Sequence, residues 1–348
     1  MQITLKLRLR DRHAAELARQ ARAVSYVWNY CNDRQRQAVR ECRRWLSYPA
    51  LAALTAGTSE DLDLHAHTIQ RVCRSYVVGR RTNKKAWLRW RGRRSLGWVP
   101  FNTGHVTFDG EAFTFRGVRY ETMHLREIPD GAVLGAGSFN ADARGRWYLN
   151  IPVDVPEATS ASISHVGIDL GLKDFAALSN GEKIGVPRFY RKSEAALASA
   201  QRARKTTRTR AIHAKAANRR RDFLHKESLK IVKDHGLVIV GNVSASQLAR
   251  TSMAKSVLDA GWSSFRDMLR YKSRLRGGGV CLEVNESGST QTCSACGAKP
   301  PSRPRGIAGL CERVWRCDDC GAVHDRDVNA ARNILRLGQQ TLAGGAHA

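Results

Sequence analysis

Two pairs of cysteines in the C-terminal part of the chain have the spacing of metal-binding knuckles. Each pair is a CxxC motif, and the four residues are Cys293, Cys296, Cys317 and Cys320. Four thiolates around one tetrahedral Zn²⁺ leave no open coordination position, so this metal would hold structure and do no chemistry. The alternative is two disulfides. Because the chain starts without an apolar signal-peptide core, we expect a reducing cytoplasm and a zinc ribbon over residues 288–322.

Acidic residues in two places suggest a second, catalytic metal. Asp169 lies in an apolar strand, where an ionised carboxylate costs several kcal/mol unless a cation offsets it. Asp325 and Asp327 begin a downstream helix; roughly 200° separates them around the axis, so only one can face the sheet and the other is expected to cap the helix. Carboxylates that converge from separate elements make a Mg²⁺ site. Two such ions about 4 Å apart can activate water and stabilise the leaving oxygen of a phosphodiester.

The charge of the chain indicates the class of partner. The 348 residues include 58 Lys and Arg against 31 Asp and Glu, a net charge of +27. Such a field attracts polyanions, chiefly nucleic acid, through phosphate contacts and counterion release. No run approaches the roughly 18 apolar residues of a spanning helix, so we expect no membrane partner and a cytoplasmic, nucleoid-associated location. The length predicts two to three domains.

The first half of the chain contains three segments with different patterns of apolar residues. Residues 1–10 alternate apolar and polar side chains, as in a strand with one buried face. Residues 12–95 have apolar positions at helical spacing. From residue 96 to about 156, short apolar runs alternate with turn residues. Several short strands at this spacing, joined by the N-terminal strand, predict a small barrel interrupted by the helical segment.

The second half predicts a mixed sheet flanked by helices. The expected strands and helices, in chain order, are strands at 165–171 and 175–179, a basic helical stretch at about 188–234, a strand at 236–241, a helix at about 253–272, a strand at 280–286 and a final helix at about 326–337.

Two basic segments are candidate nucleic-acid surfaces. Ten basic residues and no acid fall between 71 and 94, together with two tryptophans. For 71–94 the alternative is a solvated helix face with both tryptophans in the core. For 188–234 the alternative is a solvated face without a partner. The cations favour a surface that contacts the nucleic-acid backbone. The candidate residues are Arg80, Arg81, Lys84, Lys85, Arg89, Arg91, Arg93, Arg94, Arg219, Arg220, Arg221 and Lys226.

Three motifs together resemble one family. Ile168-Asp169-Leu170-Gly171, the knuckle at 290–297 and Asp325-Arg326-Asp327-Val328-Asn329-Ala330-Ala331 are similar to TnpB, the transposon-encoded RNA-guided nucleases related to compact type V CRISPR effectors. The resemblance implies cleavage of double-stranded DNA, directed by a guide RNA, next to a short recognition motif. It implies that Asp169 and Asp327 are the first and last carboxylates of a RuvC site. It also implies that the basic stretch 188–234 lines the channel for the guide–target heteroduplex.

The same resemblance implies a fold of α/β plus β class. The expected parts are a β-barrel (wedge) domain at 1–11 and 96–157, a helical recognition domain at 12–95, an RNase H-like (RuvC) domain at 158–287 and 323–348, and the zinc ribbon at 288–322.

One departure from the family concerns the middle carboxylate. Relatives usually end the strand that corresponds to 236–241 with a catalytic Glu, whereas this chain has Gly241. In an RNase H sheet the strand ending at Glu286 should lie parallel to it, about 4.8 Å away, so Glu286 can reach the vacated space. Glu286 also replaces a Pro that many relatives have. We therefore predict the set Asp169, Glu286 and Asp327, with Glu283 and Asp259 as weaker substitutes.

Two other functions stay open at this point. With Gly241 in place of the glutamate, the chain could be a nuclease-dead, RNA-guided DNA-binding repressor, because two carboxylates hold two Mg²⁺ ions poorly. It could also be an unguided, transposition-associated DNA-processing protein that uses the ribbon to contact duplex. Co-purified RNA would separate the last function from the other two.

Overall fold

The chain folds into two compact units, Met1–Pro156 and Glu157–Ala348. The computed structural model describes residues 2–42, 44–123, 128, 132–155, 162–244, 248, 250, 253–277, 279–305, 309 and 311–345. The predicted boundary at 157/158 therefore lies outside the described residues. Within the described part of the chain, no helix is long and apolar enough to cross a membrane.

The N-terminal unit contains two open sheets. The first has the order β1-β8-β7-β2, with β6 also pairing β8, and the second has the order β3-β4-β5. A single bridge, Leu9 to Thr122, connects the two. The strand bounds are β1 Gln2–Arg8, β2 Trp98–Pro100, β3 Val106–Phe108, β4 Ala112–Phe115, β5 Val118–Glu121, β6 Val133–Leu134, β7 Ser138–Ala141 and β8 Trp147–Asp154.

The predicted pairing of the N-terminal strand is confirmed, but the closed barrel is not. β1 pairs antiparallel with β8 along its whole length. Aromatic side chains fill the space between the two sheets instead: the ring of Phe139 lies 5.5 Å from Phe115 and 4.9 Å from Tyr120. Large rings hold the sheets face to face, so the described strands stay open at their edges.

The helical insert is shorter than predicted. It comprises η1 (Asp11–His13), α1 (Ala14–Cys42), α2 (Tyr48–Leu54) and α3 (Ala66–Asn83). The helical expectation is wrong for residues 84–95. Lys84 ends α3 in the left-handed conformation, with φ of 51°. The chain then runs along α1, where side chains of α1 bind its backbone in place of a helical ladder.

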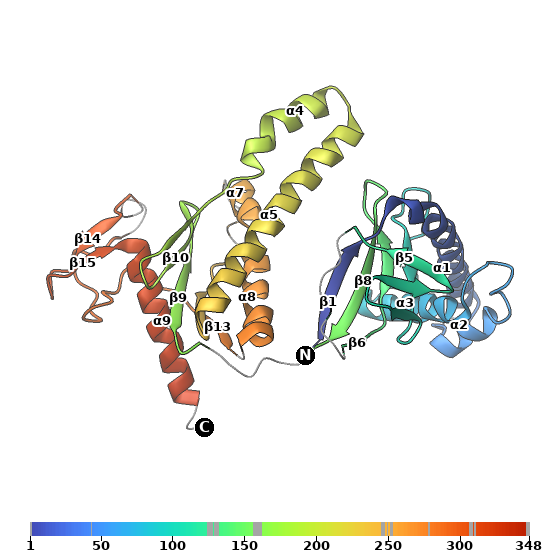
Figure 1. Ribbon diagram of the computed structural model, residues 1–348, viewed down its shortest axis with the longest axis horizontal. Coiled ribbons are helices and arrows are strands. Elements are labelled where there is room, and N and C mark those ends of the chain that lie inside the picture. The colour runs from blue at the N-terminus through green and yellow to red at the C-terminus, as the bar shows by residue number, and fades with distance from the viewer. Residues whose placement is uncertain are drawn as a thin grey trace. The chain divides into compact units, whose positions relative to one another are not determined.

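The second unit is built on a mixed sheet of order β11-β10-β9-β12-β13 (Figure 1). The strands are β9 His165–Leu170, β10 Asp174–Leu178, β11 Lys183–Gly185, β12 Leu237–Gly241 and β13 Val280–Val284. β9, β10 and β11 are antiparallel neighbours, whereas β12 is parallel to both β9 and β13. The parallel pairing of the strands that precede Gly241 and Glu286, which the resemblance implies, is present.

Helices cover the two faces of this sheet and fix which residues share a face. The helices are η2 Arg191–Ser193, α4 Glu194–Arg202, α5 Thr206–Asp234, α7 Ala254–Ala260, α8 Trp262–Gly277 and α9 Arg326–Gly345. Val238 and Val240 pack against α5, α7 and α8, whereas Leu237 and Ile239 pack against Ile334 of α9. Side chains alternate along a strand, so odd-numbered residues of β12 face α9.

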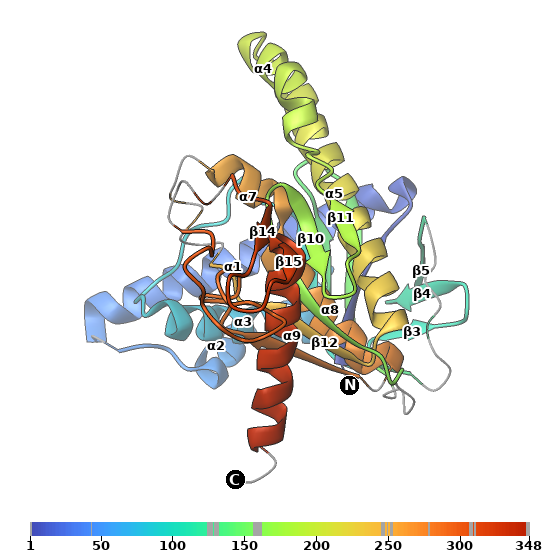
Figure 2. The same cartoon turned by 90° about the vertical axis from the view of Figure 1, so that its left-hand side faces the viewer.

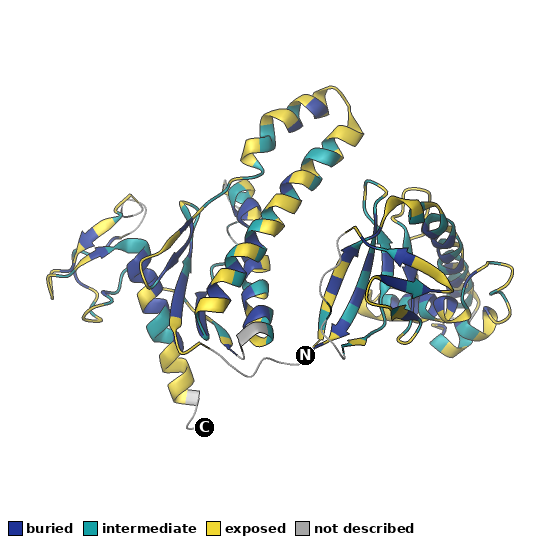
Figure 3. Cartoon of the chain, in the orientation of Figure 1, coloured by how far each residue is buried: buried dark blue, intermediate teal, exposed yellow. Residues whose placement is uncertain are grey.

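A helical arm extends beyond the sheet. α4 and the N-terminal part of α5 project past β10 and β11, with α4 at the outer end (Figure 2). The buried residues of α5 begin at Ala216 and continue to Val232. The outer part of the arm is mostly exposed (Figure 3). The predicted basic helical stretch is thus two helices, of which only the second packs on the sheet.

Candidate functional site

Three strand ends place their key residues on the face covered by α9. In β9, Gly167 touches α9 so closely that an added Cβ would lie 2.1 Å from the Ala331 carbonyl oxygen. Asp169, two residues later, has the same parity and is partly buried. In β12, Gly241 follows Ile239 on the α9 side. The α9 face at the ends of these parallel strands is therefore where a site can form.

Glu286 occupies the space above Gly241. A Cβ built on Gly241 would lie 2.0 Å from Glu286 Oε2, 3.1 Å from its Cδ and 3.2 Å from its Cβ. The two residues follow parallel strands in register, with Gly241 paired to Val284. The glycine thus provides the room that the glutamate side chain takes up. This is the approach that the sequence predicts for these two residues.

Burial and mutual repulsion shape the electrostatics of the acidic group. Burial, then the neighbouring charges of Glu286 and Asp327, raise the pKa of Asp169 well above its ordinary 3.8, while Arg326 opposes the shift. Burial also raises the pKa of Glu286, against the effect of Arg266. Carboxylates that repel one another in a buried setting favour protonation or a bound cation. Asp169, Glu286 and Asp327 are therefore brought together as one electrostatic group.

The three carboxylates offer the donor type that suits a hard divalent cation. Glu286 Oε2 is buried, and no described group donates a hydrogen bond to it. Leaving a buried carboxylate oxygen without a partner costs free energy. Oxygen ligands from three carboxylates are those that Mg²⁺ prefers in proteins. An ion held between these side chains would satisfy the orphaned oxygen and remove the repulsion.

The two aspartates at the start of α9 divide as predicted. Asp325 Oδ1 accepts hydrogen bonds from the amides of Asp327 and Val328, each at 3.1 Å, and so caps the helix. Its other oxygen pairs with Lys183 Nζ of β11 at 2.7 Å. The Asp327 carboxylate instead lies 3.4 Å from Arg313 Nη1. Asp327 is thus the member of the pair that joins Asp169.

The two weaker substitutes are engaged outside the site. Glu283 has the opposite parity to Glu286 and forms ion pairs with Arg270 and Arg266 of α8, the latter at 3.5 Å. Asp259 is buried in α7, where it accepts the amide of Tyr190 at 2.9 Å. Both lie toward the sheet face opposite α9. Of the acidic residues predicted to replace the family glutamate, only Glu286 reaches Gly241.

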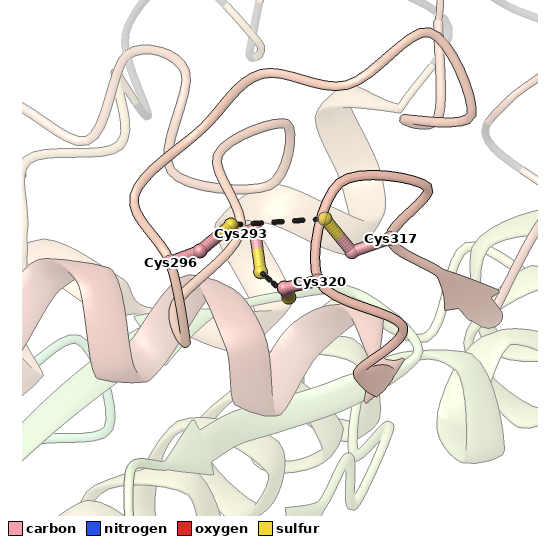
Figure 4. A group of neighbouring side chains, drawn as sticks. All are labelled: Cys293, Cys296, Cys317 and Cys320. Carbon is pink, nitrogen blue, oxygen red and sulfur yellow. Dashed lines mark hydrogen bonds between the residues drawn. The ribbon is translucent and has the colours of Figure 1, made fainter.

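The four cysteines converge as the spacing predicts (Figure 4). Their Sγ atoms all lie within 4.8 Å of one another. Each CxxC forms a matched turn: Gly297 donates to the Cys293 carbonyl and Gly321 to the Cys317 carbonyl, both at 2.8 Å. The cysteines that the structure describes are free thiols, so the disulfide alternative does not hold there.

Hydrogen bonds favour the thiolate form of one cysteine in this cluster. Burial raises the pKa of Cys293, but hydrogen bonds from the amides of Cys296 and Ala295 and from His324 lower it to about 6. The His324 ring nitrogen lies 3.0 Å from Cys293 Sγ. Four sulfurs at this separation match the donor set of a structural Zn²⁺.

Helix α9 links the cysteine cluster to the acidic group, which sequence reasoning missed. Two strands, β14 (Val314–Arg316) and β15 (Val323–Asp325), carry the second knuckle into α9. Asn329 accepts the Ser294 amide at 2.8 Å, and Asn333 Nδ2 donates to the Thr292 carbonyl at 2.7 Å. The sequence signal for this contact was two asparagines four residues apart, which lie on one face of a helix. They fix the first knuckle to the helix that bears Asp327.

The predicted basic residues separate into exposed and buried ones. Arg80 is only 1% exposed, and its guanidinium lies over Trp45 and Tyr76, so it belongs to the core. Arg91 is partly buried over Trp28 and Trp98. Arg220 is partly buried and pairs with Asp259. The exposed remainder are Arg81, Lys84, Lys85, Arg89, Arg93, Arg94, Arg219, Arg221 and Lys226.

Comparison with known families finds two matching segments. Residues 149–252 match a family described as a probable transposase, and residues 262–334 match a Cas12f1-like, TNB domain. The two segments cover most of the second unit, including the acidic residues at 169, 286 and 327 and the four cysteines.

Relatives among curated proteins and a solved structure are also found. A protein of Streptomyces pristinaespiralis, provisionally named an RNA-guided DNA endonuclease, is 31% identical over 96% of this chain and 88% of its own length. The similarly named InsQ of Escherichia coli K12 is 30% identical over 58% of this chain and 56% of its own length. A solved Cas12f1–sgRNA–target DNA complex aligns with a TM-score of 0.38 and 15% identity, covering 96% of this chain and 99% of that one.

Proposed function

The chain belongs to the TnpB family, and from that membership we propose that it is an RNA-guided DNA endonuclease that cleaves double-stranded DNA beside a short recognition motif. The Streptomyces relative, which matches 96% of this chain, carries the name of this activity. The observation that carries the proposal for this particular chain is the position of Glu286, whose carboxylate fills the space above Gly241 and raises the pKa of Asp169. A carboxylate displaced to the neighbouring strand keeps the site acidic.

In this proposal Asp169, Glu286 and Asp327 hold Mg²⁺ in a RuvC-type site on an RNase H-like sheet. Two bound ions would supply an activated water and charge stabilisation at the leaving oxygen. The chain's own residues position the carboxylates that would bind the ions. Asp325 caps α9 and so sets the direction of Asp327, and Arg313 lies against the Asp327 carboxylate. Glu286 lies in the short loop after β13, and β13 pairs in register with β12.

The four cysteines hold a structural Zn²⁺ in this proposal. Because Asn329 and Asn333 bind the first knuckle to α9, a folded ribbon stabilises the helix that carries Asp327. The metal would therefore act on cleavage only through the position of this helix. Removing it is expected to affect folding before chemistry.

Guide RNA and target DNA are the proposed partners of the exposed basic residues. Arg219 and Arg221 are exposed where the α4–α5 arm leaves the sheet. Exposed cations on this arm suit the regularly spaced phosphates of an A-form heteroduplex, which a protein recognises by shape. Arg80 is excluded from this surface because it is buried.

The test replaces Glu286 by glutamine, which keeps size and removes charge. Loss of a metal ligand worth about 4 kcal/mol would reduce cleavage of guided plasmid roughly a thousandfold, while guided DNA binding stays at the wild-type level. The matched control is Glu283→Gln, the same change on the opposite face of the sheet, where the ion pair with the half-exposed Arg270 contributes little. Equal cleavage by Glu286→Gln and wild-type protein would reject the displaced site.

Gly241 itself favours a second candidate, a nuclease-dead, RNA-guided repressor, because the strand that usually bears the catalytic glutamate has none. Wild-type protein that binds guided DNA and never cuts it, in Mg²⁺ or Mn²⁺, would establish this alternative. Purification without bound RNA would instead favour the unguided DNA-processing protein.

A further inference from the structure

Residues 84–94 form a non-helical segment whose backbone is fixed by side chains of α1. Asn32 both donates to the Leu88 carbonyl and accepts the Leu88 amide, each at 2.9 Å. Asn29 does the same for Arg91, at 2.9 and 2.8 Å. Trp28 Nε1 donates to the Arg89 carbonyl at 3.2 Å. We call residues 84–94 the Trp strap.

The strap presents two tryptophans to solvent. Trp87 and Trp90 are each 44% exposed, whereas Leu88 between them packs on the helical core. Together with Lys85, Leu88 and Arg89 they line an open hollow of about 550 Å³. Large aromatic surfaces are usually buried, so two exposed tryptophans on a rigid backbone indicate a binding surface.

Two cations line this hollow, Lys85 and Arg89, and others lie along the strap. Lys84, Lys85, Arg89, Arg93 and Arg94 are all exposed, and the strap contains no acidic residue. The Arg36 guanidinium of α1 lies 6.0 Å from the Trp87 ring. Flat aromatic faces among cations are the recurring means of holding unpaired nucleotides, since bases stack on the rings while phosphates contact the charges. Because the reciprocal hydrogen bonds already order the strap, little conformational entropy is lost on binding.

We propose that Trp87 and Trp90 form a stacking platform for unpaired bases of the guide RNA. This inference rests on the proposed function, which supplies two nucleic-acid partners. Bases of a DNA duplex are paired and stacked, so they cannot lie on a side chain before the duplex opens. Unpaired loops and ends are what proteins contact by stacking in RNA, and the guide is the partner that brings them from the start.

The experiment compares RNA affinity and its salt dependence. The probe is the RNA recovered from purified wild-type protein, sequenced and transcribed in vitro, and a single-stranded DNA of the same sequence serves as a second probe. Trp87→Ala and Trp90→Ala should each weaken RNA binding by about 5- to 150-fold. The slope of log affinity against log salt should stay at the wild-type value, because no phosphate contact is removed. Lys85→Ala should instead lower that slope by about 0.7.

Two controls separate stacking from loss of structure. Trp87→Phe and Trp90→Phe keep an aromatic face and should recover most of the affinity. Tyr26→Ala removes another exposed aromatic, on α1 and outside the strap, and should bind RNA as the wild type does. All variants should melt at the wild-type temperature within a few degrees.

The outcomes distinguish this inference from the proposed function. Wild-type protein that binds no RNA contradicts the proposed function. Wild-type binding with unchanged affinity in the double Trp87→Ala, Trp90→Ala protein overturns the platform alone, as does a loss confined to the single-stranded DNA probe. Weaker binding accompanied by a lower salt slope would also overturn it, since that is the signature of lost charge contacts.

Discussion

Adding one methyl group at Gly241 should inactivate the proposed nuclease without unfolding it. The new Cβ would lie 2.0 Å from Glu286 Oε2, where ordinary contact begins at 3.4 Å, so the carboxylate must retreat by 3.4 − 2.0 = 1.4 Å. A displacement of about 1 Å at a reacting centre can reduce the rate roughly 100-fold. Replacing a strand glycine by alanine favours the folded state by about 0.5–1 kcal/mol through the unfolded chain. Gly241→Ala should therefore cleave about 100-fold more slowly at an unchanged or slightly raised melting temperature.

The assay is single-turnover cleavage of a guided plasmid, with guided DNA binding and thermal unfolding measured on the same preparation. The matched control is Gly185→Ala, at the end of β11, where an added Cβ meets nothing within 4 Å. Wild-type cleavage by Gly241→Ala would refute the idea that Glu286 acts from the space above Gly241.

A double variant tests the same geometry in reverse. Glu286→Ala removes the Oε2 and Cδ atoms that block Gly241 and leaves only the Cβ, 3.2 Å away. Adding Gly241→Glu then returns a carboxylate to β12. Cleavage should rise above that of Glu286→Ala alone. Lower cleavage in the double variant than in Glu286→Ala would mean that β12 cannot present a ligand.

Four further predictions concern the metals and the arm. Because the pKa of Asp169 is raised above 3.8, the metal-free protein should lose stability as pH rises from about 4 through the raised value, and Asp169→Asn should reduce that loss in melts made with EDTA to the part that Glu286 contributes. Mg²⁺ at about 100 times its dissociation constant should add about 2.7 kcal/mol to wild-type stability at neutral pH and nothing to Asp169→Asn; an equal gain in both would place the ion elsewhere. Elemental analysis of reduced protein should find one zinc per chain, and Cys317→Ser should lose it together with soluble yield, whereas Cys281→Ser should keep both. Arg219→Ala with Arg221→Ala should lower the salt slope of heteroduplex binding by roughly 0.7–0.9, because residues two apart lie on opposite sides of a helix and one phosphate contact is lost, and should leave the melting temperature unchanged; an unchanged slope would remove the arm from the interface.

The sequence by itself determined the features that depend on local spacing. The CxxC pairs predict a four-sulfur cluster, and the four Sγ atoms do converge. Short apolar runs predict strands at Asp169 and before Gly241, and alternation along them decides which face each side chain takes. Helix geometry predicts that only one of Asp325 and Asp327 faces the sheet, and Asp325 is the one that caps α9. These features follow from the chain within a few residues, so no distant contact was needed to infer them.

Tertiary structure decided the features that depend on partners far along the chain. The sequence ranks Glu286 ahead of Glu283 and Asp259 but shows no contact for any of them; the register of β13 with β12 and the helix on each face put Glu286 above Gly241. Asn29 and Asn32, some sixty residues earlier, hold the Trp strap out of a helix that its local pattern favours. Arg80 reads as a surface cation until Trp45 and Tyr76 enclose it. In each case the free energy comes from packing or hydrogen bonds between elements, which residue spacing does not encode.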